Sequence, residues 1–159
     1  MATPQLPPMA DLTGYRLIKV GEQLLEAADE ALATIAIKAR HLNVLVTVKS
    51  RPDLSQQELS ELIGIDVNGM VVVIDFLEKH GLAIRARNPR DRRRHVVRVT
   101  TKGDQIVRRG GQLVSACENE FLSALTPSER TELHRLTGLL LRIDEGSRDE
   151  ADAASASVS

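Results

Sequence analysis

The spacing of apolar residues predicts a mainly helical chain that contains one short β-hairpin. Between Leu12 and Leu32, apolar residues recur every three or four positions with charged residues between them, as on a long amphipathic helix. Residues 103–125 and 127–143 are also expected to be helical. The sequence TPSE at 126–129 predicts the start of the second of these helices. Its threonine can cap the helix, its proline suits the first helical position, and its glutamate can form a hydrogen bond back to the cap.

Residues 37–48 fit both a helix and a strand. Three valines occupy alternate positions, as they would on a half-buried strand, whereas Leu42 and Leu45 are spaced as on a helix. The stretch is long for a strand, so its length favours a helix. Pro52 and Asp53 then break the element.

A short helix, a tight turn and a second helix come next. Residues 55–58 have the sequence SQQE, the form of a capping box, so a helix is expected at 56–62. After a turn at 64–66, apolar residues from Met70 to Leu77 have the spacing of one buried stripe, and Gly81 can end that helix.

The remaining pattern consists of a hairpin and two aperiodic ends. Residues 82–87 and 96–101 are β-prone runs on either side of a polar loop that contains proline, so they are expected to pair as a hairpin. Residues 1–10 and 145–159 show no apolar periodicity, so both ends are expected to be disordered and residues 11–144 to fold.

Charge is distributed unevenly along the chain. The net charge is −1, yet residues 85–109 carry nine arginines and one lysine against two aspartates, a net charge of +8. Residues 118–150 carry eight acidic residues against four arginines, a net charge of −4. Because a local field steers a polyanion, residues 85–109 are the part of the chain expected to meet phosphates.

The composition excludes several classes of function. The chain has two Phe, one Tyr and no Trp, too few aromatic residues for a platform that stacks single-stranded bases. No apolar run is long enough to cross a membrane, no secretory signal is recognisable, and the single Cys117 cannot form an internal disulfide, so a soluble protein of the cytoplasm is expected.

Catalytic and metal-binding motifs are also missing from the sequence. There is no phosphate-cradling glycine loop, no G-x-S-x-G and no HExxH, so an enzyme is not expected. The four histidines are scattered without clustered cysteines or carboxylates, so neither a metal site nor a cofactor is predicted.

Two stretches carry a family resemblance. The sequences LSQQELSELIGID (54–66) and FLEKHGLAIRARNPRDRRRHVVRVTTKG (76–103) resemble the MarR (multiple antibiotic resistance regulator) family, whose pattern is a capped helix, a recognition helix ending "Le..Gl..R", then "DRR" and "LT..G". The resemblance covers about residues 12–144. It implies one domain with a winged helix-turn-helix at 36–101, flanked by dimerisation helices at 11–34 and 103–144.

The resemblance implies a regulator of transcription. Such a protein binds pseudo-palindromic double-stranded DNA as a homodimer, and we expect a repressor that is released when a small aromatic or phenolic effector binds a cleft in the fold. The recognition helix has no Arg or Lys between Asp66 and Glu78, which departs from the family pattern. The alternative is a dimeric helical interaction protein of the same fold with weakened or lost DNA binding.

Candidate DNA-binding residues fall in three places. On the recognition helix, bases would be read from four positions, with Asn68 the best base reader and the valines able to touch thymine methyl groups: Asn68, Gly69, Val71 and Val72. Ser55 and Gln56 head the first helix of the motif, where free amides favour a phosphate, although simple helix capping explains them equally well.

The third place is the loop of the hairpin, the wing. Four of its residues are arginines that can neutralise phosphates and enter a narrow minor groove; by analogy with the family, Asp91 would orient Arg93. The wing residues are Arg90, Asp91, Arg92, Arg93 and Arg94.

Effector and redox roles are predicted for fewer residues. Arg40 and His41 lie on the helix that would line the family's effector cleft, where they could meet an anionic ligand. Cys117 could sense oxidants, but the sensing cysteines of the family lie near the N-terminus and not on the penultimate helix.

Overall fold

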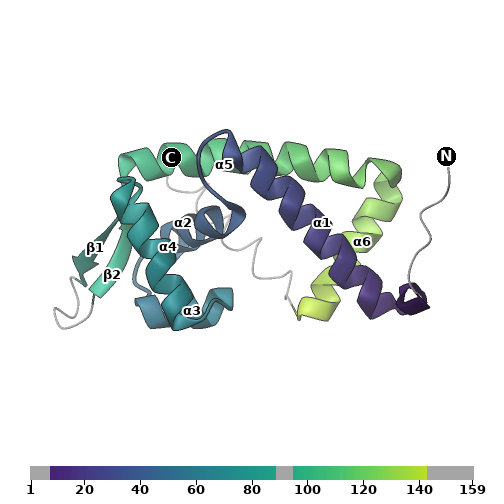
Figure 1. The fold of residues 1–159 in the computed structure, drawn as a ribbon, viewed down its shortest axis with the longest axis horizontal. Helices are drawn as coiled ribbons and strands as arrows, with labels where there is room; N and C mark the ends of the chain where they lie inside the picture. Colours follow the sequence, from purple (N-terminus) through teal and green to yellow (C-terminus); the bar gives the residue numbers. More distant parts are fainter. Residues whose placement is uncertain (1–7, 89–94, 143–159) are drawn as a thin grey trace, which may run out of the picture. The chain divides into compact units, whose positions relative to one another are not determined.

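A computed structural model describes residues 8–88 and 95–142. They form a mainly helical fold with one antiparallel hairpin, which confirms the expected fold class (Figure 1). The elements are η1 (Pro8–Asp11), α1 (Thr13–Ala33), α2 (Ala39–Ser50), α3 (Gln56–Ile63), α4 (Val67–Lys79), β1 (Ala83–Arg87), β2 (His95–Val99), α5 (Thr101–Phe121), η2 (Leu122–Ala124) and α6 (Pro127–Leu141). None of the helices within the described ranges is long and apolar enough to cross a membrane.

The chain divides into two compact units, residues 1–119 and 120–159. The first unit holds the elements from η1 to β2 and all of α5 except its last two residues, and the second unit holds η2 and α6. The short 3-10 helix η1 begins at Pro8, inside the segment that was expected to be disordered. The expectation of a single domain at 11–144 stays a prediction, as does disorder at 145–159, which lies outside the described residues.

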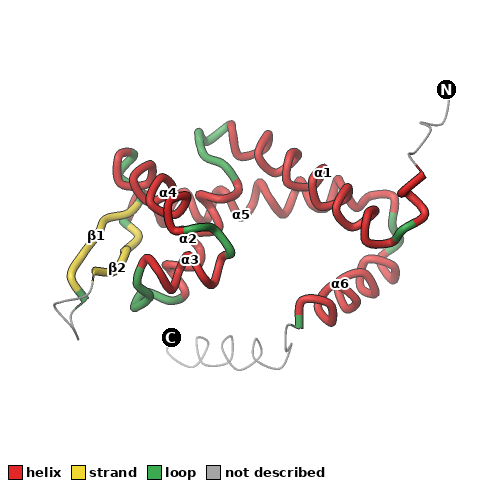
Figure 2. Tube along the Cα trace, turned by 60° about the horizontal axis from the view of Figure 1, so that its bottom comes forward, coloured by secondary structure: helices red, strands yellow, loops and turns green. Residues whose placement is uncertain are grey.

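The core of the first unit lies among α2, α3, α4 and the hairpin. The tube in Figure 2 shows these elements gathered at one end of α5. Leu32 at the end of α1 also enters this core, whereas the first half of α1 contributes no buried side chain. The largest fully buried side chains are Leu32, Leu45, Leu59, Met70, Ile74 and Leu77, followed by Val44, Val73 and Val96.

The ambiguous stretch at 37–48 is helical from Ala39 onward. Leu42, Val44, Leu45 and Val48 of α2 are buried, which is the stripe of a helix, while Val46 is 43% exposed. A strand would have placed the three valines on one face, and a helix turns Val46 to the opposite side. The preference for a helix is confirmed, and its start at Ala39 is fixed by Asp29 of α1, whose carboxylate accepts the Ala39 N–H at 2.6 Å.

The predicted caps form as expected. Ser55 N–H donates to the Glu58 carboxylate at 2.7 Å, and Glu58 N–H donates to the Ser55 hydroxyl at 3.3 Å. Thr126 and Glu129 make the same pair of bonds at the start of α6. The Thr126 N–H and hydroxyl both donate to the Glu129 carboxylate, and these two bonds lower its pKa. Gly64 (φ 75°) and Gly81 (φ 68°) take the left-handed conformation just after α3 and α4.

The second strand and the helix after it begin and end earlier than predicted. β2 pairs with β1 from Arg87↔His95 to Ala83↔Val99, and stops there. Its expected continuation to residue 101 is wrong because the Thr100 hydroxyl accepts the Gly103 N–H at 3.0 Å, which caps α5 and starts it at Thr101 instead of 103. The same helix ends at Phe121 and gives way to η2.

Candidate nucleic-acid interface

The second helix of the motif, α4, presents a short polar and apolar face to solvent. Asp66 caps the helix by accepting the Gly69 N–H at 2.9 Å. The apolar stripe predicted from the sequence is buried, and this determines which face of α4 is exposed. Asn68 is exposed and makes no side-chain hydrogen bond within the described residues, and Val72 is 61% exposed. The side chains of Asn68 and Val72 are therefore both accessible to a ligand.

Gly69 and Val71 are less exposed to solvent than Asn68 and Val72. Both are half-buried, and a Cβ at Gly69 would lie 3.0 Å from Ile65 Cγ2 and 3.0 Å from Asp66 Oδ2. The glycine thus allows the Asp66 cap to close over the start of the helix. That Asn68, Gly69, Val71 and Val72 contact bases stays a prediction.

An ionic clamp joins the recognition helix to the wing. The Arg85 N–H on β1 donates to the Glu78 carboxylate at 2.7 Å, and its guanidinium contacts both Glu78 and Asp75, the latter at 2.7 Å. The hairpin is therefore held in a defined position on α4. Sequence reasoning missed this role, although Glu78 and Arg85 are the "e" and "R" of the family pattern, and it counted Arg85 among the cations available to phosphate.

A second set of contacts ties α4 to the start of α5. The Thr100 hydroxyl donates to the Gly81 carbonyl at 2.7 Å, and the Lys102 ammonium donates to the His80 carbonyl at 2.9 Å. Gly103 lies so close to the hairpin that a Cβ there would be 2.0 Å from the Leu82 carbonyl oxygen. Thr100 and Gly103, which match the "LT..G" part of the family pattern, thus allow α5 to pack closely against the base of the wing.

The first helix of the motif, α3, begins beside the wing. Ser55 forms an isolated antiparallel bridge with Val96 of β2, and its hydroxyl is used in the capping box. Capping, one of the two explanations for Ser55, is confirmed. A phosphate contact from Ser55 and Gln56, both half-buried, stays a prediction.

The predicted wing residues Arg90, Asp91, Arg92, Arg93 and Arg94 lie outside the described residues. The pair Arg87↔His95 closes the hairpin immediately below them, and both of these side chains are exposed. The structure therefore describes the base of the wing.

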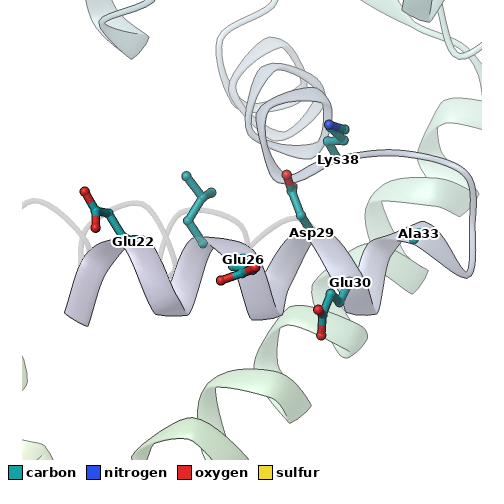
Figure 3. A pocket seen from close by; sticks show the side chains of 7 residues that line it. Glu22, Glu26, Asp29, Glu30, Ala33 and Lys38 are labelled. Carbon is teal, nitrogen blue, oxygen red and sulfur yellow. The ribbon is translucent and has the colours of Figure 1, made fainter. Parts of the chain in front are cut away.

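A hollow on α1 marks a part of the first unit that is unsuited to DNA. It has a volume of about 530 Å³, and Figure 3 shows the side chains that line it, among them four acidic side chains of α1 and Lys38. A surface with this charge repels a polyanion. Its lining residues are Glu22, Leu25, Glu26, Asp29, Glu30, Ala33 and Lys38.

A second pocket brings the two predicted effector residues together with the recognition helix. It measures about 360 Å³ and is lined by Arg40 and His41 of α2, Val72 and Phe76 of α4, and residues of α1 and the α1–α2 turn. The His41 ring stacks face to face on Phe76, with centroids 4.0 Å apart and planes 3° apart, and Phe76 in turn stacks on His80. Sequence reasoning missed Phe76, whose rarity as an aromatic residue was the available signal.

His41 is held neutral in this wall. Its Nδ1 accepts the Lys38 N–H at 3.0 Å, so the neutral ring carries its proton on Nε2. Burial of the ring, with a further contribution from the positive charge of Arg40, lowers the pKa of His41 from 6.5 to about 4. His41 and Phe76 thus form a flat, aromatic and uncharged part of the pocket wall, and the charged residues of the lining are Arg40, Lys38 and Asp29.

Replacing His41 by asparagine is expected to flatten the pH dependence of folding stability. The folded-state pKa lies below the unfolded one, so the unfolded chain takes up a proton first as the pH falls. The contribution of neutral His41 to the free energy of unfolding is complete above about pH 6.5. It is lost as the pH falls from 6.5 to 4, which lowers the free energy of unfolding by about 1–3 kcal/mol. Urea unfolding of both proteins at several pH values in this window measures the change. If the free energy of unfolding depends on pH with the same slope in wild type and variant, His41 does not have a lowered pKa in the folded protein.

The other candidate chemistry does not assemble into a site. Within residues 8–88 and 95–142, no three His, Cys, Asp or Glu side chains come together as a metal ion requires. Cys117 is half-buried on α5 as a free thiol. A redox role for Cys117 stays a hypothesis.

A capped helix, a tight turn, a second helix with an exposed N-terminal face and a clamped hairpin together define a winged helix-turn-helix protein. The model of the MarR family matches residues 37–95. The chain is also 30% identical, over 130 residues, to the transcriptional repressor MprA of Escherichia coli (strain K12), which covers 80% of this chain and 74% of that protein. The chain belongs to the MarR family of transcriptional regulators.

Two further similarities agree with this assignment. A protein of Thauera aromatica described as a candidate transcriptional regulatory protein for the hcr operon is 34% identical over 101 residues, which span 64% of this chain but only 61% of that relative. The solved structure of the transcriptional repressor CouR bound to a 23-mer DNA duplex has a TM-score of 0.78 and 26% identity, and the match covers 88% of this chain and 99% of CouR.

Proposed function

We propose that this protein represses transcription by binding an inverted-repeat operator as a homodimer. The observation that carries the proposal is the exposed N-terminal face of α4, with the unbonded Asn68 amide, next to a wing that Arg85 clamps in place. A helix of this kind fits the major groove and reads base edges from its N-terminal residues. MprA, a repressor, and CouR, which binds a DNA duplex, support the assignment.

The wing supplies most of the phosphate binding in this proposal. Arg90, Arg92, Arg93 and Arg94 reach the backbone or a narrow minor groove, and Asp91 orients Arg93. Specific affinity then depends strongly on salt, because each neutralised phosphate releases counterions. A regulator that works on chromosomal DNA acts in the cytoplasm, which is where we place it.

A homodimer accounts for apolar side chains that the described residues leave uncovered. Each unit carries its own set, one along α1 with the turn before it and one along α6, where burial would stabilise association. They are Leu12, Leu17, Ile18, Val20 and Leu25, all at least 43% exposed, and Leu136, Leu139, Leu140 and Leu141, also at least 43% exposed. Two wings per dimer match two half-sites about one helical turn apart.

The pocket between α1, α2 and α4 is the proposed effector site. Its stacked His41 and Phe76 suit a flat ring, and Arg40 suits an acidic group on that ring. Because Val72 and Phe76 belong to α4, an occupant touches the recognition helix directly and can shift the dimer away from its DNA-binding state. Aromatic acids that bind the protein without changing operator affinity would disprove this coupling.

Selection from randomised duplex DNA at two salt concentrations tests the proposed function. A regulator is expected to enrich an inverted repeat and to lose affinity steeply between the two concentrations. Failure to enrich any sequence would favour the second candidate, a dimeric interaction protein that keeps the fold without specific DNA binding. That candidate draws its support from the recognition helix, whose only cation is Lys79 at its last residue.

A further inference from the structure

We propose that α4 reads an A·T core in each half-site, with Asn68 on an adenine and Val72 on the methyl group of a neighbouring thymine. This inference rests on the proposed function, since it specifies what a DNA-binding recognition helix would recognise. It is carried by the chemistry that the exposed face of α4 offers and by the contacts that take the other polar side chains of that helix out of use.

Readers of guanine are missing from the helix. Guanine is read most often by the bidentate donors of Arg or Lys, which reach its O6 and N7 atoms in the major groove. Along α4, from Val67 to Lys79, the only such residue is Lys79. It lies at the C-terminal end, away from the N-terminal turns that enter the groove, and so cannot read a base there.

Readers of cytosine are present but already engaged. Cytosine is recognised by carboxylates that accept its N4 amino group. The Asp66 carboxylate caps the helix by accepting the Gly69 N–H at 2.9 Å. Asp75, although exposed, pairs with Arg85 at 2.7 Å, and Glu78 binds both the N–H and the guanidinium of Arg85.

Adenine and thymine are the bases that the remaining side chains can recognise. An Asn amide pairs in bidentate fashion with N6 and N7 of adenine, and an apolar side chain packs on the thymine methyl. Asn68 is exposed and unbonded among the described residues, Val72 is 61% exposed, and Val67 beside them is 56% exposed. The face is therefore complementary to A·T pairs on both counts.

The spacing of the two side chains sets the size of the core. Asn68 and Val72 are four residues apart, so they lie on the same face with Cβ atoms about 5–6 Å apart. Successive bases are separated by about 3.4 Å along a strand. The thymine read by Val72 is thus expected within about two base pairs of the adenine read by Asn68.

Deoxyuridine provides a direct test, because it removes the thymine methyl and leaves base pairing unchanged. The probe is the duplex most enriched in selection from a randomised library, resynthesised with deoxyuridine at one half-site thymine at a time. Loss of one contacted methyl is expected to weaken binding by the wild-type protein about fourfold. The loss should occur at one or two positions within about two base pairs of the adenine, and nowhere outside the half-site core.

The variant Val72→Ala links the methyl to the side chain. Val72 is solvent-exposed and alanine favours helix, so the variant is expected to fold. It should bind the thymine duplex less tightly and should no longer discriminate deoxyuridine at one of the sensitive positions. The control is Val46→Ala on α2, a 43% exposed valine outside α4, which should keep the full deoxyuridine penalty.

The outcomes separate this inference from the function on which it rests. Enrichment of half-sites with a G·C core, or full affinity for every deoxyuridine duplex, overturns the inference and leaves a sequence-specific regulator. An unchanged deoxyuridine penalty in Val72→Ala overturns it too, because the methyl would then act through DNA shape. No enrichment of any sequence overturns the proposed function itself, and the inference with it.

Discussion

Replacing Gly103 by alanine is expected to destabilise the protein by about 3 kcal/mol or more, a large part of the roughly 5–15 kcal/mol that ordinarily stabilises a folded domain. The added Cβ would lie 2.0 Å from the Leu82 carbonyl oxygen and 2.7 Å from Val99 Cγ1. The carbonyl cannot move away cheaply, because it accepts the Thr100 N–H at 3.1 Å while Leu82 N–H donates to the Leu77 carbonyl at 2.8 Å. The clash therefore reaches α4 and the hairpin together.

Gly111→Ala is the matched control for this prediction. Gly111 lies on the same helix and a Cβ there meets nothing within 4 Å. Alanine in a helix interior is favoured over glycine by up to about 1 kcal/mol, so this variant should unfold at a slightly higher urea concentration than wild type. Similar unfolding midpoints for Gly103→Ala and wild type would mean that α5 does not approach Leu82 as the structure shows.

Much of the fold followed from the sequence because its signals are local. A capping box spans four residues, and a helical stripe repeats every three or four, so Ser55 with Glu58 and Thr126 with Glu129 announced their helices correctly. Element ends were less well predicted where a cap comes from a side chain outside the motif. Asp29 fixes the start of α2 from ten residues away, and no periodicity within α2 reports it.

The candidate site was predicted less completely, because it depends on contacts between elements. Asn68 and Val72 could be placed on the exposed side of α4 from the buried stripe alone. The clamp of Arg85 on Asp75 and Glu78 joins a strand to a helix, and the stack of His41 on Phe76 joins α2 to α4. Neither pairing leaves a periodic trace in the sequence, although both decide which side chains remain free for DNA or an effector.

The double variant Arg92→Ala, Arg93→Ala is expected to weaken operator binding by about a hundredfold or more while the dimer stays folded. If these arginines contact phosphates, a dimer loses four contacts, and the slope of log K against log salt falls by about 0.9 for each. The measurement is operator affinity across a salt series, with unfolding followed alongside to confirm an intact fold.

A control variant with the same loss of charge makes this result specific to the wing. Arg108→Ala, Arg109→Ala removes two exposed arginines from α5, within the same basic segment of residues 85–109. Because charge that is not in contact with phosphate is screened within about 8–10 Å at physiological salt, the control should change the salt slope far less. Equal losses in the two double variants would show that the basic segment attracts DNA only through its overall charge, and the wing would then have no special place in operator binding.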